Sequence, residues 1–401
     1  MSFFKLTIRD VPLDHQTVLV RVDYNVPLNK KGEIHDDLRI RASLPTIHYL
    51  LDHHCKVVLM AHLGRPEGRD ASLSLEPIGE RLSTLIKHPV TFVDDCIGDK
   101  VVQAVKKSSQ NAIVLLENLR FYPEEEADDE AFAKKIASST GARYFVQDGF
   151  GVVHRAHAST HAITLCIPSV AGLLLENEYE TITEAMERPK RPFIAVVGGA
   201  KIDDKIGFIE RLSKTADKII IGGAMANTFL AYKGHDMGGS LMETDQNNQL
   251  DRIYTVAHKK TKESVEEFII LPVDVAVAEE TDAKSVRENL RLGDIPKSKR
   301  ALDIGDSSIE RMVKEIELAK TVIWNGPLGY AELPEFAHGS ARLALALASQ
   351  PDTTSIVGGG DTADFVLKWD GRDGASFTHV STGGGAGLEL MAGQKLPGVE
   401  S

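Results

Sequence analysis

The feature that most constrains how this chain can fold is a steady alternation of short strand-like runs with helical patterns. The runs are rich in Val, Ile and Leu and lack strict polar–apolar alternation, which is typical of parallel strands buried on both faces. The expected strands cover residues 17–22, 56–60, 90–93, 112–116 and 144–146 in the first half and 193–197, 218–221, 268–271, 321–324, 355–357 and 378–380 in the second. Helical patterns lie between them, for example at 44–54, 75–86 and 128–138. This alternation predicts an α/β fold built from parallel sheets.

The length of the chain and one proline-containing segment indicate two domains. A chain of 401 residues exceeds the size at which single hydrophobic cores stop growing. Two prolines and several charges at 186–192 come directly before an expected strand, and residues 173–186 have the pattern of a helix. We therefore expect two doubly wound parallel-sheet (Rossmann-like) domains joined by a helical hinge. The expected parts are an N-terminal domain at 1–172, a connecting helix at 173–188, a C-terminal domain at 189–385 and a C-terminal segment at 386–401 that packs back on the N-terminal domain.

Composition and charge narrow the classes of partner. The formal net charge is 46 − 58 = −12, which disfavours a general nucleic-acid binder because such proteins present a basic face. The longest apolar stretch, residues 162–175, is too short to span a bilayer and contains Pro168. Three widely spaced cysteines fit no disulfide framework or metal motif, and the N-terminus has no secretory pattern. We expect a cytoplasmic protein that binds neither nucleic acid nor membrane.

Cationic side chains follow several expected strands of the first half. Ligands of an open α/β sheet bind beyond the carboxyl ends of its strands, and Arg suits forked recognition of phosphate and carboxylate. The segments at these ends are 23–25, 61–65, 117–120 and 148–151, and the last leads into His154-Arg155-Ala156-His157. One such Arg would most simply be a surface residue, but their repetition predicts an anion site. The spacing of His154, His157 and His161 also permits a metal site, although Arg155 favours an anion and no carboxylate or Cys completes the set.

The strand ends of the second half carry glycines instead. Glycine lets a backbone approach a ligand closely, and it opens helices whose N-termini favour anions. The glycine segments are 198–199, 222–223, 326, 358–360 and 383–385. Neither a G-x-x-x-x-G-K-[ST] loop nor a G-x-G-x-x-G fingerprint occurs, so a phosphate-binding half of another kind is predicted. The acidic run at 124–126 is expected to be a solvated loop.

Taken together, these motifs resemble those of the phosphoglycerate kinase family. Arg21-Val22-Asp23-Tyr24-Asn25-Val26-Pro27, His62-Leu63-Gly64-Arg65-Pro66, Leu116-Glu117-Asn118-Leu119-Arg120-Phe121 and His154-Arg155-Ala156-His157 are similar to its substrate-half motifs. Gly198-Gly199-Ala200-Lys201, Trp324-Asn325-Gly326-Pro327, Gly358-Gly359-Gly360-Asp361-Thr362 and Ser381-Thr382-Gly383-Gly384-Gly385-Ala386 are similar to its nucleotide-half motifs. The resemblance runs from about residue 17 to the C-terminus in the family's order.

The resemblance implies a reversible reaction in which ADP and 1,3-bisphosphoglycerate give ATP and 3-phosphoglycerate, with Mg²⁺, in a monomer. It places the 3-phosphoglycerate site at Asp23, Asn25, Arg39, His62, Arg65, Arg120 and Arg155. It places nucleotide contacts at Gly199, Lys201, Lys205, Gly222, Asn325, Glu332, Gly359, Gly360, Asp361 and Thr362. The implied catalytic residues are Arg39, Lys201, Gly360 and Gly384, the implied metal ligand is Asp361, and Glu332 would meet the ribose.

Several positions depart from the family's commonest pattern, and two other functional classes stay open. The departures are Ala61, Gln147, Gly149, Asp306-Ser307 and Tyr330-Ala331, and none of them removes a charged phosphate ligand. A nucleotide-dependent dehydrogenase would also use doubly wound sheets, but it predicts the missing dinucleotide fingerprint. A catalytically silent scaffold on the same fold would be expected to lack some of these charged residues, and all are present.

Overall fold

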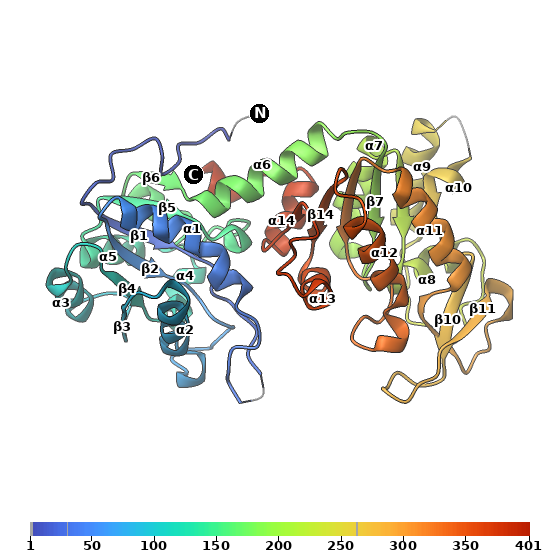
Figure 1. The fold of residues 1–401 in the computed structure, drawn as a ribbon, viewed down its shortest axis with the longest axis horizontal. Coiled ribbons are helices and arrows are strands. Elements are labelled where there is room, and N and C mark those ends of the chain that lie inside the picture. Colours follow the sequence, from blue (N-terminus) through green and yellow to red (C-terminus); the bar gives the residue numbers. More distant parts are fainter. Residues whose placement is uncertain (1–2, 30, 262–263) are drawn as a thin grey trace. The chain divides into compact units, whose positions relative to one another are not determined.

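The computed structural model describes residues 3–29, 31–261 and 264–401, and the chain divides into two compact units. The first unit comprises Met1–Glu180 together with Lys395–Ser401, and the second comprises Thr181–Gln394. Helix α6 (Leu173–Glu187) begins in the first unit and ends in the second. In Figure 1 the colours follow the sequence, so that the first unit is mostly blue to green, the second is mostly green to red, and α6 is green.

The first unit is built on a parallel sheet, as the sequence predicts, but it has six strands where five were expected, because the strand Ser169–Ala171 was missed. Its strands are β1 (Thr17–Arg21), β2 (Lys56–Met60), β3 (Val90–Val93), β4 (Ile113–Leu116), β5 (Tyr144–Gln147) and β6 (Ser169–Ala171). The strand order is β3-β4-β2-β1-β5-β6, so the chain winds outward from β1 in both directions. The carboxyl ends of β1, β2, β4 and β5 therefore lie along one edge of the sheet.

Helices cover both faces of this sheet. They are α1 (Leu38–Asp52), α2 (Glu76–Ile86), α3 (Asp99–Lys107), α4 (Pro123–Glu126) and α5 (Glu130–Thr140). Val18 and Val20 of β1 belong to a buried cluster that includes side chains of α1 and α2. Leu19, between them, points to the other face and joins a second cluster with α3 and α5. Each strand is thus apolar on both sides, which explains its unbroken run of Val, Ile and Leu.

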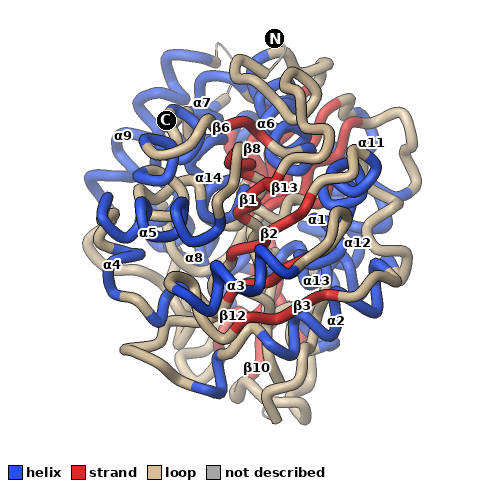
Figure 2. The backbone as a smooth tube through the Cα atoms, turned by 90° about the vertical axis from the view of Figure 1, so that its left-hand side faces the viewer, coloured by secondary structure: helices blue, strands red, loops and turns tan. Residues whose placement is uncertain are grey.

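The second unit repeats this arrangement with the strand order β15-β14-β13-β7-β8-β9. Its parallel strands are β7 (Phe193–Val197), β8 (Lys218–Ile221), β9 (Ile269–Ile270), β13 (Thr321–Asn325), β14 (Thr354–Gly358) and β15 (His379–Val380). Its helices are α7 (Ile206–Thr215), α8 (Gly223–Tyr232), α9 (Asn247–Lys260), α10 (Val265–Phe268), α11 (Asp306–Leu318), α12 (His338–Ala348), α13 (Gly360–Asp370) and α14 (Gly385–Met391). Figure 2 shows α7, α8 and α9 on the opposite side of the strands from α11, α12 and α13.

A three-stranded antiparallel sheet in the second unit was not expected from the sequence. Strand β10 (Asp274–Ala278) lies between β11 (Glu288–Arg291) and β12 (Arg300–Ile304). Helix α8 contacts β12, and α11 contacts β10. This small sheet matters for function because β12 and the segment after β10 line the pocket described below.

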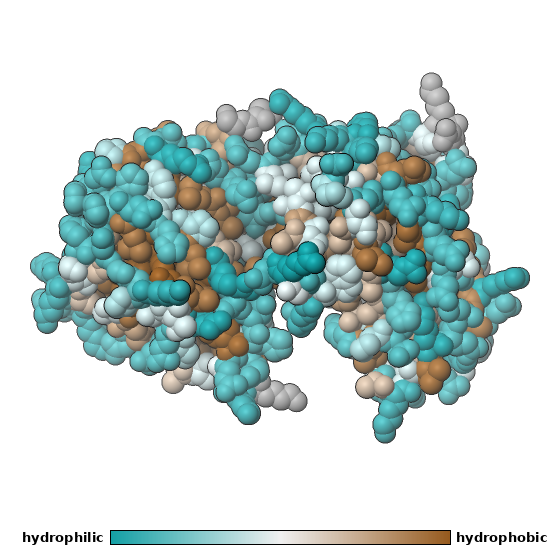
Figure 3. All heavy atoms as spheres, viewed as in Figure 1, coloured by the Kyte–Doolittle hydropathy of each residue, from teal (hydrophilic) through white to brown (hydrophobic). Residues whose placement is uncertain are grey.

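Several expected elements have different bounds in the structure, and two illustrate why. Helix α1 begins at Leu38 instead of residue 44, because Pro45 lies inside the helix and does not begin it. The strand expected at 268–271 is only Ile269–Ile270, since Phe268 closes α10. On the face drawn in Figure 3, hydrophilic residues cover much of the surface of each unit, as expected when helices cover the apolar sheets.

The segment Lys395–Ser401 belongs to the first unit although the chain reaches it from the second. It contains the short helix α15 (Pro397–Glu400). The backbone N–H of Gly398 donates to Val153 O at 2.9 Å, and Lys5 Nζ donates to Glu400 O at 2.6 Å. None of the helices within the described ranges combines the length and the apolar character needed to cross a membrane.

Candidate active site

Several residues expected to bind substrate meet at the carboxyl edge of the first sheet. Arg39 Nη1, on α1, donates to Asp23 Oδ2 at 2.9 Å and to Asn25 O at 3.2 Å, both in the loop after β1. Asn25 Oδ1 accepts from the N–H of Gly64, which follows β2, at 2.9 Å. Arg120 Nη1, after β4, donates to Gly64 O at 2.6 Å. A chain of hydrogen bonds thus links three strand ends and brings two arginines together.

His62, next to these residues, is held as a neutral imidazole. Its Nδ1 is 3.1 Å from Arg21 Nη2, and both side chains are buried. A guanidinium can only donate, so His62 Nδ1 accepts and the proton of the neutral ring sits on Nε2. Burial, followed by the positive charges of Arg21 and Arg120, lowers the pKa of His62 well below its ordinary value. His62 is therefore a neutral donor through Nε2.

Arg21 is itself neutralised by a buried carboxylate that the sequence analysis placed in solvent. The expectation of a solvated loop at 124–126 is wrong for Glu125, which is fully buried. Its Oε1 lies 3.8 Å from Arg21 Nη2 and accepts from Ser159 Oγ at 2.5 Å. Ser159 Oγ in turn accepts from Arg21 Nε at 2.8 Å. A buried charge must be paired to be tolerated, and this triad supplies the pairing beneath His62.

Arg65 and Arg155 complete the cluster as its exposed members. Both residues are solvent-exposed, and no hydrogen bond or ion pair engages either guanidinium within the described part of the chain. Burial, followed by the positive charges of Arg155 and Arg65, lowers the pKa of Arg120, whose own Nε lies 3.0 Å from Glu126 Oε1. Arg65 and Arg155 therefore add positive charge that no carboxylate in the described part of the chain pairs with.

The three histidines after β5 do not converge. Residue 157 is buried, with His157 Nδ1 at 3.8 Å from Glu125 Oε1, whereas His161 Nδ1 lies 2.6 Å from Asp128 Oδ2. Burial, Arg21 and Arg120 lower the pKa of His157 to about 4. No group of three or more His, Cys, Asp or Glu side chains within residues 3–29, 31–261 and 264–401 is arranged to hold a metal ion.

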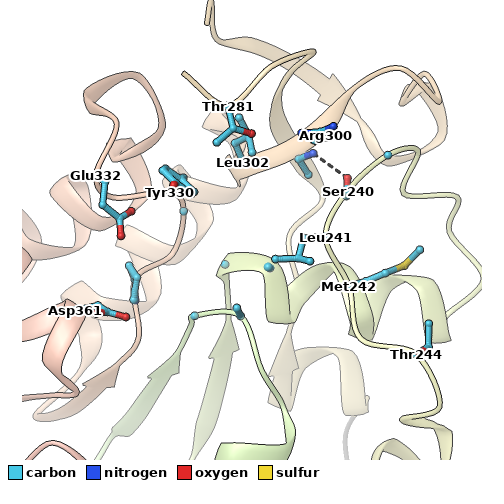
Figure 4. Close-up of a pocket in the computed structure, with 18 residues that line it drawn as sticks. Ser240, Leu241, Met242, Thr244, Thr281, Arg300, Leu302, Tyr330, Glu332 and Asp361 are labelled. Atoms are coloured by element: carbon cyan, nitrogen blue, oxygen red, sulfur yellow. Dashed lines mark hydrogen bonds between the residues drawn. The ribbon is translucent and has the colours of Figure 1, made fainter. Parts of the chain in front are cut away.

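The second unit contains a pocket of about 710 Å³, within the range usual for ligand sites. Three of the expected nucleotide residues line it, namely Gly199, Glu332 and Asp361. Figure 4 shows Glu332 and Asp361 on one side of the pocket and Leu241 and Met242 on the other. One end thus offers glycine backbone and carboxylate, and the other offers apolar side chains.

Two glycines that adjoin lining residues of this pocket allow close backbone contacts. A Cβ on Gly198 would lie 2.1 Å from Pro327 O, and one on Gly326 would lie 2.2 Å from Gly198 O. Lys205 Nζ donates to Gly198 O at 2.8 Å and to Asn325 O at 3.1 Å. Lys205 therefore ties together the ends of β7 and β13 in this structure.

The other expected nucleotide residues lie around the pocket rather than in its lining. Lys201 is exposed, and Gly360 is the exposed first residue of α13, preceded by Gly359 at φ +88°. Thr362 Oγ1 accepts from the N–H of Gly326 at 2.8 Å, and Asn325 is buried. Gly222 precedes helix α8, and Gly384, expected to be catalytic, precedes α14.

The sequence analysis missed many of the residues that line this pocket. The missed residues are Leu241, Met242, Thr281, Arg300, Leu302 and, as a lining residue, Tyr330. They come from the segment after α8, from the three-stranded sheet and from the loop after β13. No repeated glycine or charge pattern identifies these residues in the sequence. Only Tyr330 was noted, as a departure from the family's commonest residue. Ser240 Oγ, which accepts from Ala301 N at 2.8 Å, fixes the first of these segments to β12 (Figure 4).

The pocket of the second unit offers carboxylate to a divalent cation but no closed set of ligands. Asp361 is an exposed carboxylate in its lining, and no group of three or more His, Cys, Asp or Glu side chains in the described ranges is arranged to hold a metal ion. Mg²⁺ is commonly held by one or two carboxylates together with substrate phosphates and water. The residues therefore fit Mg²⁺ that arrives with a nucleotide, and they do not form a cage for it.

Comparison with known proteins agrees with the resemblance. Residues 8–394 match the family model described as Phosphoglycerate kinase. Phosphoglycerate kinase of Desulforudis audaxviator is 45% identical over 396 residues, which cover 98% of each chain. That of Dictyoglomus turgidum is 46% identical over 394 residues, covering 98% of this chain and 97% of the relative. The structure of phosphoglycerate kinase from Coxiella burnetii matches with a TM-score of 0.84 and 33% identity, over 99% of this chain and 98% of that one. The chain belongs to the phosphoglycerate kinase family.

Proposed function

We propose that the protein transfers a phosphoryl group reversibly between 1,3-bisphosphoglycerate and ADP, giving 3-phosphoglycerate and ATP, as a step of glycolysis and gluconeogenesis. The observation that carries this proposal is the basic cluster of the first unit, two of whose arginines have no partner in the described chain. Arg65, Arg120 and Arg155 lie together with two guanidinium groups free of protein partners in the described chain. Arginine forks suit a doubly charged phosphate, and such a cluster is costly unless an anion occupies it.

The two units would divide the substrates between them. In the N-terminal domain, 1–172, Arg65, Arg120 and Arg155 would bind the phosphate of 3-phosphoglycerate. Its carboxylate and hydroxyl would meet Asp23, Asn25, Arg39 and His62, the last of which donates through Nε2. In the C-terminal domain, 189–385, the pocket would take adenine nucleotide.

The nucleotide would lie with its base against the apolar side of the pocket and its phosphates toward the glycines. Leu241 and Met242 supply the apolar surface, and Glu332 lies where a ribose would follow. The proposed phosphate contacts are Gly199, Lys201, Lys205, Gly222, Asn325, Gly359, Gly360, Asp361 and Thr362. The N–H groups of Gly360 and Gly384 would add donors at the beginnings of two helices.

The chemistry needs no general base. The attacking carboxylate is already ionised at neutral pH, because its reference pKa is near 4. Its oxygen forms a bond to the γ-phosphorus of ATP, the bond to the β–γ bridging oxygen breaks, and ADP leaves with both electrons. Arg39 would offset the repulsion between the two anions, and Lys201 would follow the transferring oxygens. When bound to the nucleotide phosphates and Asp361, Mg²⁺ supplies further charge neutralisation.

Transfer would require the two ligands to meet, because different units bind them. The helix at 173–188 would act as the hinge, and closure would exclude the water that hydrolyses an acyl phosphate. The monomeric state and the cytoplasmic location stay predictions. All three cysteines are free in the structure, which suits a reducing compartment.

The proposal is tested by mixing purified protein with ATP, Mg²⁺ and 3-phosphoglycerate and following ADP release, with hydroxylamine present to trap acyl phosphate. We expect turnover that depends on both the acid and the metal. Folded protein that binds nucleotide but shows no turnover would replace the proposal with a catalytically silent scaffold.

A further inference from the structure

The loop after β13 carries Tyr330 and Glu332 into the nucleotide pocket, and a buried carboxylate beneath it anchors its far end. Asp303, on β12, has a fully buried side chain. Its Oδ2 accepts from the N–H of Gly339 at 3.0 Å, at the beginning of α12. Its Oδ1 accepts from the N–H of Ile304 at 2.9 Å. The carboxylate thus binds the point at which the loop enters its next helix.

Arg287, which directly precedes β11, neutralises this carboxylate. Its side chain is only 7% exposed, and its Nη1 lies 3.0 Å from Asp303 Oδ2. The same Nη1 contacts Glu335 O of the loop at 3.4 Å. Its Nη2 donates to Ile304 O at 3.0 Å and to Asp306 Oδ1 at 3.2 Å. One guanidinium therefore joins the small sheet, the beginning of α11 and the loop.

The loop fits closely over this ion pair. A Cβ on Gly329 would lie 2.4 Å from Asp303 Oδ1, and one on Gly339 would lie 2.7 Å from the same atom. Between these glycines, Phe336 is fully buried against Ala276 and Ala278 of β10. The loop therefore touches Asp303 at both of its ends and the central strand of the small sheet in between.

We propose that Arg287 and Asp303 are positioning residues for the nucleotide, a role that rests on the proposed function. Neither residue lines the pocket. They hold the loop of residues 329–339 so that Tyr330 and Glu332 stand at the pocket wall. The small antiparallel sheet thereby acts as the support of the nucleotide site.

The physical basis is the cost of leaving one buried charge without its partner. Without Arg287, the buried carboxylate of Asp303 would have no counter-ion. Its free energy would then fall if it moved toward water or took up a proton. Burial already raises the pKa of Asp303 to about 6 despite Arg287. Either response disturbs Gly339 and the loop. In the proposed function this loop lies at the nucleotide and not at the acid, so we expect the effect to be confined to nucleotide binding.

The test compares Arg287→Leu with Arg291→Leu, which removes an equal charge from an exposed position in β11 of the same sheet. ADP binding is measured by isothermal titration calorimetry, and KM for ATP, KM for 3-phosphoglycerate and kcat are measured well below the melting temperature. For Arg287→Leu we expect Kd for ADP and KM for ATP to rise about tenfold, with KM for 3-phosphoglycerate within about twofold of the parent. Arg291→Leu should match the parent.

Arg287→Lys provides a milder variant in case Arg287→Leu does not fold. It keeps the charge beside Asp303 but loses the fork to Ile304 O and Glu335 O, so an intermediate rise in Kd for ADP is expected. If both variants at position 287 bind ADP as the parent does, or if KM for both substrates rises equally, the positioning role is wrong. A parent protein that neither binds ADP nor turns over would instead refute the proposed function.

Discussion

Arg39, which we propose to be catalytic, is held by protein contacts on only part of its guanidinium. Asp23 and Asn25 hold its guanidinium through one nitrogen, and its side chain is 28% exposed. The remaining donors can therefore reach a ligand without breaking these bonds. This arrangement preorganises a charge, which is the property that lowers a barrier.

Replacing Arg39 with Met should lower kcat by about 10²–10³, the usual effect of removing one preorganised donor. Its exposure means that the fold should survive. The matched control is Arg41→Met, on the same helix, whose guanidinium pairs with Asp37 at 2.7 Å. Steady-state kinetics and circular dichroism of both variants give the comparison. A kcat for Arg39→Met close to that of Arg41→Met would contradict the assignment.

His157 should make the fold sensitive to acid. Its folded-state pKa is about 4, whereas an unfolded histidine titrates near 6.5, so the unfolded chain binds the additional proton between these values. Stability from this residue is therefore complete above about pH 6.5 and is lost as the pH falls toward 4. His157→Gln should reduce the loss of unfolding free energy between pH 7 and pH 5, by up to about 1.4 kcal/mol per pH unit.

Urea denaturation at both pH values measures this difference. His35→Gln, at an exposed position of the same unit, serves as the control. His62 remains in both variants and keeps its own contribution of the same sign. Equal pH dependence in His157→Gln and His35→Gln would show that His157 is not held neutral.

Individual residues also show which features of the site can be predicted from the sequence and which cannot. Arg65 and Arg120 were found because they follow strands, and strand ends converge in a parallel sheet, whereas Arg39, on α1, was assigned through the family resemblance. The burial of Glu125 could not be found in this way. Its neighbours in sequence are acidic, but its partners Arg21 and Ser159 lie far away along the chain. Only the tertiary fold brings these three groups together.

At the scale of elements, the glycine at the end of β13 is required for two separate reasons. Gly326 has φ +100°, a conformation that L-residues rarely adopt, and a Cβ there would meet Gly198 O at 2.2 Å. Gly234, after α8, has φ +91° but nothing within 4 Å of a Cβ. Alanine at Gly234 would therefore incur the cost of backbone strain alone, whereas alanine at Gly326 would incur both strain and a steric clash.

Gly234→Ala should lose about 1–2 kcal/mol of unfolding free energy from strain alone. Gly326→Ala should lose about 1–3 kcal/mol more, because the backbones of β7 and β13 must move apart. Guanidinium denaturation of both variants measures the two losses. Equal losses would mean that the strands separate at no cost and that close packing at Gly198 is unimportant.

Regular buried strands were the most predictable elements. Lys56–Met60, Phe193–Val197 and Lys218–Ile221 match their expected bounds, because each is a short apolar run between helical patterns. The three-stranded sheet was missed. Its strand Glu288–Arg291 is mostly exposed and carries two charged residues in four, so no period-two pattern marks it. The pocket lining from that region was missed for the same reason.

For the whole molecule, the proposed division of substrates predicts a change of dimension during the reaction. Small-angle scattering should give a smaller radius of gyration with 3-phosphoglycerate and a non-transferring ATP analogue with Mg²⁺ together than with either alone. The reason is that transfer needs the reacting oxygens about 3–3.5 Å from the phosphorus. An unchanged radius at saturation, in protein that shows turnover, would refute closure about the helix at 173–188.

Because Lys395–Ser401 belongs to the first unit, the last part of that unit is synthesised after the second unit. Domains generally fold as they leave the ribosome, with the N-terminal one first. Here the first unit emerges early, but the partner of Val153 O, the N–H of Gly398, is translated only after the entire second unit. During that interval the nascent first unit lacks its final contacts. The first unit can therefore gain this last segment only after the whole second unit has been synthesised.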